Sequence, residues 1–229
     1  MIYDGWLLRF AEGYTRRANS VNPLCLSTLE LDKKLAFCER LYHERELPVI
    51  FKLTDAAQPP GLDAVLAARG YRVDAPTSVQ LLDLDRATLQ PAPDVKTDEA
   101  LTAQWLDTYS RISGLSDRNR AILPRILSNI IPAHGYASLS VEGRIVTAGL
   151  GVVQSGCTGL YDIVTDPAFR SRGYGRQVVE GLLMWGRAQG ASIAYLQVML
   201  DNAPALRLYA NLGFVEHYRY WYRVAPANT

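Results

Sequence analysis

The six residues at positions 170–175 constrain the fold of this chain most, because they join an apolar segment to an amphipathic one. Their sequence is Arg-Ser-Arg-Gly-Tyr-Gly. Residues 158–165 are apolar and rich in β-branched side chains, which predicts a strand in or near the centre of a sheet. Residues 176–189 carry apolar side chains mainly on one side at helical spacing, and Gly190 stands where a helix C-cap glycine belongs. The pattern predicts a strand that enters a helix through a glycine- and arginine-rich turn.

Such a turn is suited to bind a phosphate or a pyrophosphate. Gly173 and Gly175 allow close approach of the backbone, and a helix N-terminus offers unpaired N–H groups and a partial positive charge. Three arginines add further charge: Arg170, Arg172 and Arg176. A Walker loop is excluded because no Lys-Ser/Thr pair follows the glycines. The dinucleotide fingerprint is also excluded, because Val178 stands where its third glycine should be.

A second motif follows in residues 193–214. Residues 193–200 are an apolar run of strand length. Either Asp201 or Asn202 can cap the helix that comes next, and Pro204 suits its first turn. Gly213 is placed to end this helix.

Together the two motifs resemble those of the GCN5-related N-acetyltransferase (GNAT) superfamily. Its acetyl-CoA signature, Arg/Gln-x-x-Gly-x-Gly/Ala between a strand and a long helix, is matched by Arg170, Gly173 and Gly175. A later motif, Asn-x-x-Ala-x-x-Leu-Tyr-x-x-x-Gly-Phe, is matched at Asn202, Ala205, Leu208-Tyr209 and Gly213-Phe214. The resemblance implies an α/β (α+β) fold with a mixed, mostly antiparallel central sheet flanked by helices.

Composition adds limits on partners and compartment. The chain has 229 residues, 48% hydrophobic and 21% charged, with a formal net charge of +1. That charge gives no reason to expect a nucleic acid or a membrane as partner. The three cysteines are far apart and lack metal-ligand spacing, so we expect reduced thiols and no metal. Neither a signal-peptide pattern nor an apolar run of membrane-spanning length is found, and we therefore expect a cytoplasmic protein.

The first ninety residues repeat the element order of the last fifty. Residues 5–10 and 15–21 flank a glycine-containing turn and predict a hairpin. A helix at 28–45, a strand at 48–53, a short helix at 62–69 and a strand at 78–84 follow. This order of helix, strand, helix and strand is also the order predicted from residue 176 to residue 224, which suggests a weak internal repeat.

The repeat lacks the coenzyme motif in its first copy. Residues 19–26 contain no Arg-x-x-Gly-x-Gly, and Leu66-Ala67 stands at the place of Leu208-Tyr209. The resemblance thus implies a tandem GNAT protein with two GNAT-like halves. Residues 1–90 are predicted to form a degenerate half that binds no coenzyme. Residues 91–229 are predicted to form the catalytic domain. The boundary is placed in residues 86–96, which contain Pro91-Ala-Pro93.

The second half shows the remaining elements of the superfamily. Thr97 is a candidate cap for an amphipathic helix that runs to Ile112, and a second helix leads to Pro132. Residues 136–141 and 145–153, separated by Glu-Gly-Arg, predict a hairpin.

Site residues are implied by the resemblance rather than by the spacing of the residues. Backbone groups of Ile163, Val164 and Thr165 would face the pantetheine arm and the thioester, and Asn202 would bind pantetheine or serve only as the helix cap. Tyr209 matches the usual general acid, which also contacts the coenzyme. Asp162 is a candidate base, although strand alternation lets only one of Tyr161 and Asp162 face the pocket. The pyrophosphate would lie on seven consecutive residues: Arg170, Ser171, Arg172, Gly173, Tyr174, Gly175 and Arg176.

The candidate residues for binding the acceptor belong to a basic cluster near the N-terminus. We expect Arg16 or Arg17, together with Asn19, to pair with a carboxylate of the acceptor; the alternative is a polar strand face. The predicted function is an acetyl-CoA-dependent N-acetyltransferase that acts on a primary amine of a small molecule by direct attack in a ternary complex. The alternatives are transfer of a longer acyl group, a protein amine as acceptor, or a non-catalytic coenzyme-A-binding sensor module.

Overall fold

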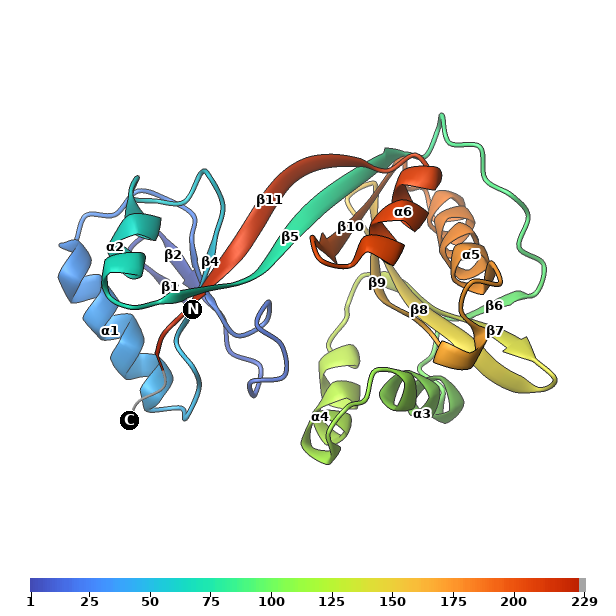
Figure 1. Cartoon of the computed structure of the whole chain (residues 1–229), viewed down its shortest axis with the longest axis horizontal. Coiled ribbons are helices and arrows are strands. Elements are labelled where there is room, and N and C mark those ends of the chain that lie inside the picture. The colour runs from blue at the N-terminus through green and yellow to red at the C-terminus, as the bar shows by residue number, and fades with distance from the viewer. Residues whose placement is uncertain (227–229) are drawn as a thin grey trace. The chain divides into compact units, whose positions relative to one another are not determined.

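The computed structural model describes residues 1–226 and shows an α+β protein (Figure 1). It divides into two compact units. The first consists of Met1–Ser78 together with Tyr218–Thr229, and the second is Val79–His217. Two long strands, β5 (Arg72–Asp83) and β11 (Val215–Val224), each pass from one unit into the other. The division between the compact units therefore falls within these two strands, and each unit is described separately below.

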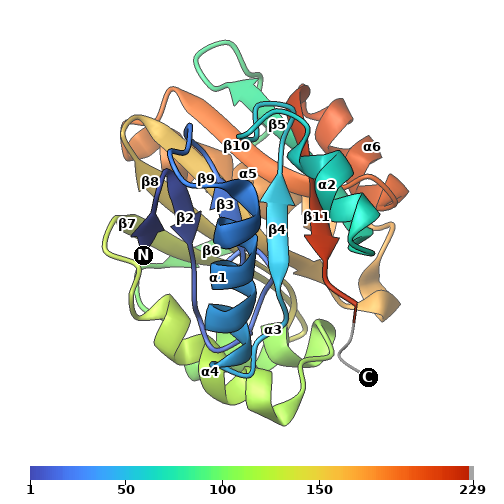
Figure 2. The ribbon, with the colours of Figure 1, turned by 90° about the vertical axis from the view of Figure 1, so that its left-hand side faces the viewer.

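The first unit is a mixed sheet with helices on one face. Its strand order is β1 (Ile2–Tyr3), β2 (Trp6–Leu8), β3 (Val21–Pro23), β4 (Ile50–Leu53) and β11. The pair β3 and β4 is parallel, and the pairs β1–β2, β2–β3 and β4–β11 are antiparallel. Helices α1 (Leu31–His43) and α2 (Leu62–Ala68) cover one face of this sheet (Figure 2). Trp6, Phe51 and Leu53 anchor the core between them.

The predicted N-terminal hairpin is correct in its pairing and wrong in its extent. Strands β2 and β3 pair antiparallel, but residues 9–20 form a loop instead of continuing both strands. The side chain of Asn19 organises this loop. Its Oδ1 accepts hydrogen bonds from the N–H groups of Ala11 at 2.6 Å and Gly13 at 3.0 Å, and its Nδ2 donates to the carbonyl of Thr15 at 2.7 Å. Asn and Asp side chains compete with strand ladders through such local bonds.

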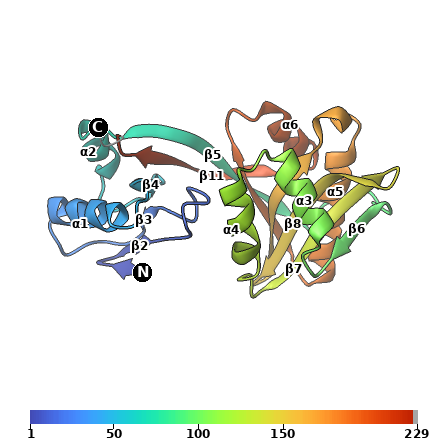
Figure 3. The same cartoon turned by 90° about the horizontal axis from the view of Figure 1, so that it is seen from below.

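The second unit is a larger sheet with helices on both faces. Its strands lie in the order β5, β10 (Ile193–Met199), β9 (Cys157–Thr165), β8 (Arg144–Gln154), β7 (Ala133–Val141) and β6 (Val95–Asp98). The pair β9 and β10 is parallel, and β6 to β9 pair antiparallel. Helices α5 (Tyr174–Ala188) and α6 (Ala203–Asn211) lie on one side of β8 and β9 (Figure 1). Helices α3 (Ala103–Ile112) and α4 (Asp117–Leu127) lie on the other side (Figure 3). The expectation of a mixed, mostly antiparallel sheet flanked by helices is confirmed.

One predicted helix start is wrong. Thr97 lies in the edge strand β6, paired with Ala137, and the helix cap is Thr102, whose side chain accepts a hydrogen bond from the N–H of Trp105. The strand β6 was missed because four residues of a polar edge strand carry little apolar periodicity. The hairpin of β7 and β8 and the helix cap at Asn202 agree with the sequence.

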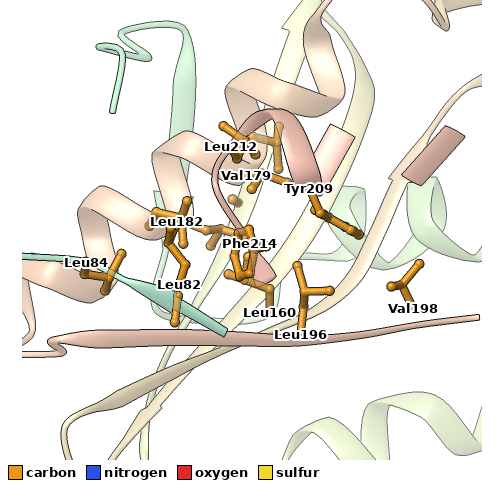
Figure 4. Close-up of a cluster of buried hydrophobic side chains, with 14 of the residues drawn as sticks. Leu82, Leu84, Leu160, Val179, Leu182, Leu196, Val198, Tyr209, Leu212 and Phe214 are labelled. Atoms are coloured by element: carbon orange, nitrogen blue, oxygen red, sulfur yellow. The ribbon is translucent and has the colours of Figure 1, made fainter. Parts of the chain in front are cut away.

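Close packing of α5 on the sheet sets where this helix begins. The glycines of β7 and β8 leave room for its large side chains; a Cβ at Gly151 would meet Leu182 and Trp185 at 3.1 Å, and one at Gly149 would meet Leu182 and Val178 at 3.1 Å. The buried cluster formed by α5, α6 and the strands is shown in Figure 4. The N-terminus of α5 is thereby held beside the C-terminal end of β9, where the site is expected.

Among residues 1–226, no helix combines the length and the apolar character that crossing a bilayer requires.

Candidate functional site

The parallel strands β9 and β10 separate at one end. Their pairing runs from Cys157 and Ile193 to Leu160 and Leu196 and stops there, although β9 continues to Thr165 and β10 to Met199. Beyond Leu160, the edge of β9 that faced β10 is left without a strand partner in the described chain. Backbone groups on such an edge are open to a ligand that forms strand-like hydrogen bonds.

Unpaired backbone donors gather where β9 leads into α5. After the short 3₁₀ turn Pro167–Phe169, the chain reaches Gly173, whose φ of 81° begins the helix at Tyr174. Within the part of the chain that the structure describes, the N–H groups of residues 171–176 donate no hydrogen bond, and Gln177 is the first to bond back, to the carbonyl of Gly173 at 3.1 Å. Six consecutive free donors at a helix N-terminus are a geometry suited to an anion.

The two motif glycines serve this turn in different ways. Gly173 adopts a left-handed φ that L-residues rarely tolerate, with no atom within 4 Å of where a Cβ would stand. Gly175 has ordinary helical φ, but a Cβ there would approach Thr165 Oγ1 at 3.1 Å. The first glycine makes the turn possible, and the second lets the first turn of α5 lie close to β9.

The arginines of the turn have partners within the second unit. Arg170 Nε donates to the carbonyl of Thr165 at 3.2 Å, and the guanidinium of Arg172 lies 5.3 Å from the centre of the Phe169 ring. Arg176 pairs at 3.2 Å with Glu180, a buried residue that also accepts the N–H of Gln90. Arg170 and Arg176 thus hold the turn in place through contacts within the second unit.

A β-bulge in β9 presents Asp162 in an unusual conformation. The register with β8 shifts between Ala148, opposite Val164, and Leu150, opposite Tyr161, and Asp162 has a φ of 52°. Its carboxylate accepts a hydrogen bond from Tyr109 Oη of α3 at 3.0 Å. Bulges of this kind redirect side chains and are frequent beside active sites.

The bulge also corrects the expectation that only one of Tyr161 and Asp162 faces the pocket side. Ile163 points toward α5, since a Cβ at Gly149 would meet it, whereas Asp162 reaches Tyr109 of α3. Tyr161 pairs with Leu150 and its hydroxyl lies 2.5 Å from that of Tyr195 on β10. Both Tyr161 and Asp162 therefore lie on the α3 face, because the extra residue interrupts the alternation.

Aromatic side chains surround the Asp162 carboxylate. Tyr109 stacks on Trp105 with ring centres 5.3 Å apart, and Trp105 meets Tyr136 edge-on at 5.2 Å. Burial, and then the negative charge of Asp162, raise the pKa of the Tyr136 hydroxyl. Tyr109 and Tyr136 were not singled out from the sequence, and only the three-dimensional packing of α3 on β7 brings them to Asp162.

Tyr209 lies on α6, and Asn202 is the N-cap of this helix, at the separated end of β10. Asn202 caps the helix, and its Oδ1 accepts the N–H of Ala205 at 3.2 Å. The cap leaves its side-chain NH₂ as a donor for a ligand. Figure 4 shows the ring of Tyr209 at the end of the buried cluster nearer Val198, with Leu84 at the other end.

The Tyr209 hydroxyl is held protonated by its surroundings. The side chain is 7% exposed, and burial raises its pKa to about 12. In the described chain the hydroxyl forms no hydrogen bond, and the ring packs edge-on against Phe214 at 5.8 Å. A phenol in this state is a proton donor with an uncommitted O–H.

A charged cluster that the sequence did not reveal anchors the turn to α3. Asp166 is 5% exposed, and its Oδ2 accepts from Arg111 of α3 at 2.7 Å and from Arg144 of β8 at 2.8 Å. Its Oδ1 caps the 3₁₀ turn through the N–H of Ala168 at 3.1 Å. The hydrogen bond from Arg111 is the main cause of a lowered Asp166 pKa. These bonds fix the position of Asp166 and therefore of the point where the turn of residues 167–173 begins.

The residues predicted for the acceptor, Arg16, Arg17 and Asn19, belong to the first unit, whereas all the others belong to the second. Arg16 pairs with Asp74 at 2.5 Å, and Arg17 Nη2 donates to Tyr220 Oη at 3.4 Å. Asn19 is 2% exposed and uses its amide within the loop described above.

Comparison with known proteins agrees with this geometry. Residues 1–223 match the family model "Probable histone acetyltransferase Rv0428c C-terminal". The chain is 31% identical over 225 residues, 96% of its length and 89% of the relative's, to "Uncharacterized N-acetyltransferase YobR" of Bacillus subtilis (strain 168). It is 36% identical over 96 residues, 41% of the chain and 54% of the relative, to "N-alpha-acetyltransferase RimI" of Mycobacterium tuberculosis.

Solved structures show the same fold at low sequence identity. A GCN5-related N-acetyltransferase from Kribbella flavida aligns with a TM-score of 0.73 and 15% identity, covering 100% of this chain and 89% of that one. A tandem GNAT protein from the clavulanic acid biosynthesis pathway aligns with a TM-score of 0.64 and 16% identity, covering 86% and 70%. Given the family match along nearly the whole sequence, the chain is an N-acetyltransferase of the GNAT superfamily and belongs to the family of "Probable histone acetyltransferase Rv0428c C-terminal".

Proposed function

We propose that the second unit binds acetyl-CoA and transfers its acetyl group to a primary amine of a small molecule, by direct attack in a ternary complex. The observation that carries this proposal is the row of six free N–H groups at residues 171–176, beside the open edge of β9. A pyrophosphate is the ligand that such a row accepts. An extended amide-containing arm such as pantetheine can continue along the strand edge.

Each predicted coenzyme residue has a distinct part in this proposal. The N–H groups from Ser171 to Arg176 hold the pyrophosphate, with Arg172 adding charge. Backbone groups of Ile163 and Val164 bond the pantetheine arm, and Asn202 donates its side-chain NH₂. The carbonyl of Thr165 is engaged by Arg170 Nε, so Thr165 contributes its N–H or its side chain.

The chemistry requires one proton to be removed and one to be supplied. When bound, the coenzyme provides a thioester; the amine nitrogen bonds to its carbonyl carbon, the C–S bond breaks and the thiolate is protonated. Tyr209 supplies the latter proton: its phenol is protonated at neutral pH, burial raises its pKa to about 12, and its O–H has no acceptor among the described residues. Asp162 accepts the proton of the acceptor amine, directly or through water, while Tyr109 holds the carboxylate in place.

A protein amine is the second candidate acceptor. The relatives that match part of the chain include "[Ribosomal protein bS18]-alanine N-acetyltransferase" of Escherichia coli (strain K12), 31% identical over 78 residues, 34% of the chain and 53% of the relative. That similarity covers about a third of the chain. An acceptor screen must therefore contain peptides with free N-termini as well as small amines, and acyl-CoAs of increasing length test the choice of acyl donor.

The decisive assay follows thiol release from acetyl-CoA with each class of amine. We expect turnover with a small primary amine and a fall in kcat of about 10²–10⁴ for Tyr209→Phe, with little change in the KM for acetyl-CoA. Tyr3→Phe, which removes a phenol stacked on Phe37 in the first unit, is the matched control and should keep full activity. Turnover with peptides alone would show that the acceptor is a protein amine. An unchanged kcat in Tyr209→Phe would show that Tyr209 is not the general acid.

A further inference from the structure

The α3 side of β10 carries two polar residues beside the point where this strand separates from β9. Leu196 and Val198 are buried in the core beneath α5 and α6 (Figure 4). Because side chains alternate along a strand, Tyr195 and Gln197 point to the opposite face of the sheet, on the side of α3. Leu196 is the last residue of β10 that pairs with β9. Gln197, which follows it, therefore stands where the edge of β9 becomes open.

Two tyrosines form a fixed wall next to Gln197. Tyr195 is opposite Gly159 in the register of β9 and β10. A Cβ at Gly159 would lie 2.6 Å from the Tyr195 ring and 2.7 Å from the Tyr161 ring, so both rings cover this glycine. Their hydroxyl oxygens are 2.5 Å apart, and one hydroxyl donates to the other. The two rings are thereby held against the sheet at the side of Gln197.

The side-chain amide of Gln197 is a polar group without a partner on this surface. Its Oε1 is shielded from solvent and accepts no hydrogen bond from residues 1–226. A buried amide oxygen that receives no hydrogen bond is unfavourable, and such a group in a native structure calls for a functional reason. An amide presents an acceptor and a donor side by side, so a second amide matches both.

The charge of the two strands indicates a neutral ligand group. Neither β9 nor β10 contains a Lys or an Arg, and Asp162 is their one charged residue. A carboxylate close to the acceptor amine would meet the like charge of Asp162, with no cation from these strands to offset it. A neutral amide avoids this repulsion and keeps both hydrogen bonds to Gln197.

We infer that Gln197 is a specificity residue of the acceptor site and that it recognises a neutral amide next to the acceptor amine. The inference rests on the proposed function, in which the amine reaches the thioester at the open edge of β9. Gln197 lies one residue beyond the last pair of the two strands, and Asp162 lies two residues beyond it. Because the two side chains start so close together, only a few bonds separate the amine from the amide.

The acceptor class is therefore that of aminoamides. It differs from the carboxylate-bearing acceptor that the basic residues near the N-terminus led us to expect. A small aminoamide and the N-terminus of a peptide both present this group. Leucinamide and leucylglycylglycine represent the two sources, and whichever is acetylated faster identifies the source.

Matched acceptors test the recognition through a difference in rate. Leucinamide and leucine methyl ester have the same side chain and amines of similar basicity, but the ester lacks the amide N–H. We expect kcat/KM to be about 10-fold or more higher for leucinamide than for the ester. Leucine, which carries a carboxylate, should also be poorer than leucinamide.

Two variants assign the difference to one side chain. In Gln197→Met, kcat/KM for leucinamide should fall by about 10- to 100-fold, and that for the ester should stay within about twofold. Gln154→Met, at an exposed position at the other end of β8 and β9, is the matched control and should behave as the wild type. Equal kcat/KM for amide and ester in the wild type would overturn the inference.

Binding gives a second readout that needs no turnover. The side-chain ¹⁵N signal of Gln197 is assigned by its loss in Gln197→Met and is followed with and without coenzyme A. We expect leucinamide to shift this signal and the ester to shift it less. A signal that leucinamide moves in neither condition would overturn the inference. Absence of thiol release with every amine would count against the proposed function, whereas the Gln197 signal would still decide the inference.

Discussion

Asp162 shows how one residue combines a strained backbone with a placed charge. A φ of 52° is uncommon for any residue with a Cβ, although Asp and Asn tolerate it better than most. The bulge turns the carboxylate toward Tyr109 and keeps Ile163 in the core beneath α5. Strain of this kind is maintained where the surrounding packing fixes the conformation, and it is frequent at active sites.

For Asp162→Asn we expect the fold to be kept and kcat/KM to fall by about 10²-fold or more at neutral pH. Asn accepts the left-handed conformation and can still accept the Tyr109 hydrogen bond, but it has no charge to take a proton. Asp107→Asn, on the exposed side of α3, is the control. An unchanged kcat/KM in Asp162→Asn would show that the base is another group or water.

At the scale of elements, the helix α3, the strand β8 and the pyrophosphate turn meet at one carboxylate. Asp166 is bonded to Arg111, to Arg144 and to the N–H of Ala168. Its lowered pKa means that the folded state binds this proton more weakly than the unfolded chain does. The resulting stabilisation is complete above the ordinary Asp value and is lost as the pH falls below about 4.

We expect Asp166→Asn to lower the free energy of unfolding by about 1–3 kcal/mol at pH 7, because a buried charged acceptor is lost. The difference from the wild type should shrink as the pH falls below about 4. Urea unfolding at pH 7 and pH 3 measures this, with Asp117→Asn on α4 as the control. A difference between variant and wild type that is as large at pH 3 as at pH 7 would contradict the linkage.

The elements that the sequence predicted are those whose pattern is set by local burial. Helices α1, α5 and α6 and strands β4, β9 and β10 all have continuous apolar faces, and the turn at residues 170–175 has a glycine pattern that backbone geometry requires. The bulge at Asp162 and the bonds of Asp166 to Arg111 and Arg144 depend on contacts between distant residues, and the loop held by Asn19 depends on side-chain bonds to the backbone of residues 11–15. No local periodicity reports such contacts, so they were either missed or predicted wrongly.

On the scale of the whole molecule, the two units share their strands. The first unit takes Tyr218–Thr229 from the far end of the chain, and β11 pairs there with β4. Trp221 Nε1 and Arg223 Nε donate to Asp63 of α2 at 2.7 and 2.8 Å. The matching order of α1, β4, α2, β5 and of α5, β10, α6, β11 agrees with the proposed internal repeat, and the tandem origin with a degenerate first half stays a prediction.

A chain that ends at His217 should lose the first unit and keep much of the second. The truncation removes the part of β11 that pairs with β4. It also removes the described hydrogen bonds from β11 to Asp63 of α2. We expect limited proteolysis to digest residues 1–78 of this truncated chain while a fragment close to 79–217 persists. A chain truncated only after Pro226 is the control. Equal resistance of both units after the longer truncation would contradict the shared-strand architecture.

The central claim is that free N–H groups at the start of α5 bind the coenzyme, and calorimetric binding of acetyl-CoA tests it most directly. Gly173→Asp introduces a carboxylate beside these groups, at a position with φ of 81° and no neighbour within 4 Å. Gly143→Asp is the matched control, since Gly143 has a φ of 79° and is equally open in the turn between β7 and β8. We predict binding to the wild type and to Gly143→Asp and none to Gly173→Asp. Equal binding to all three proteins would contradict the assigned site, and no binding to the wild type would contradict acetyl-CoA as the ligand.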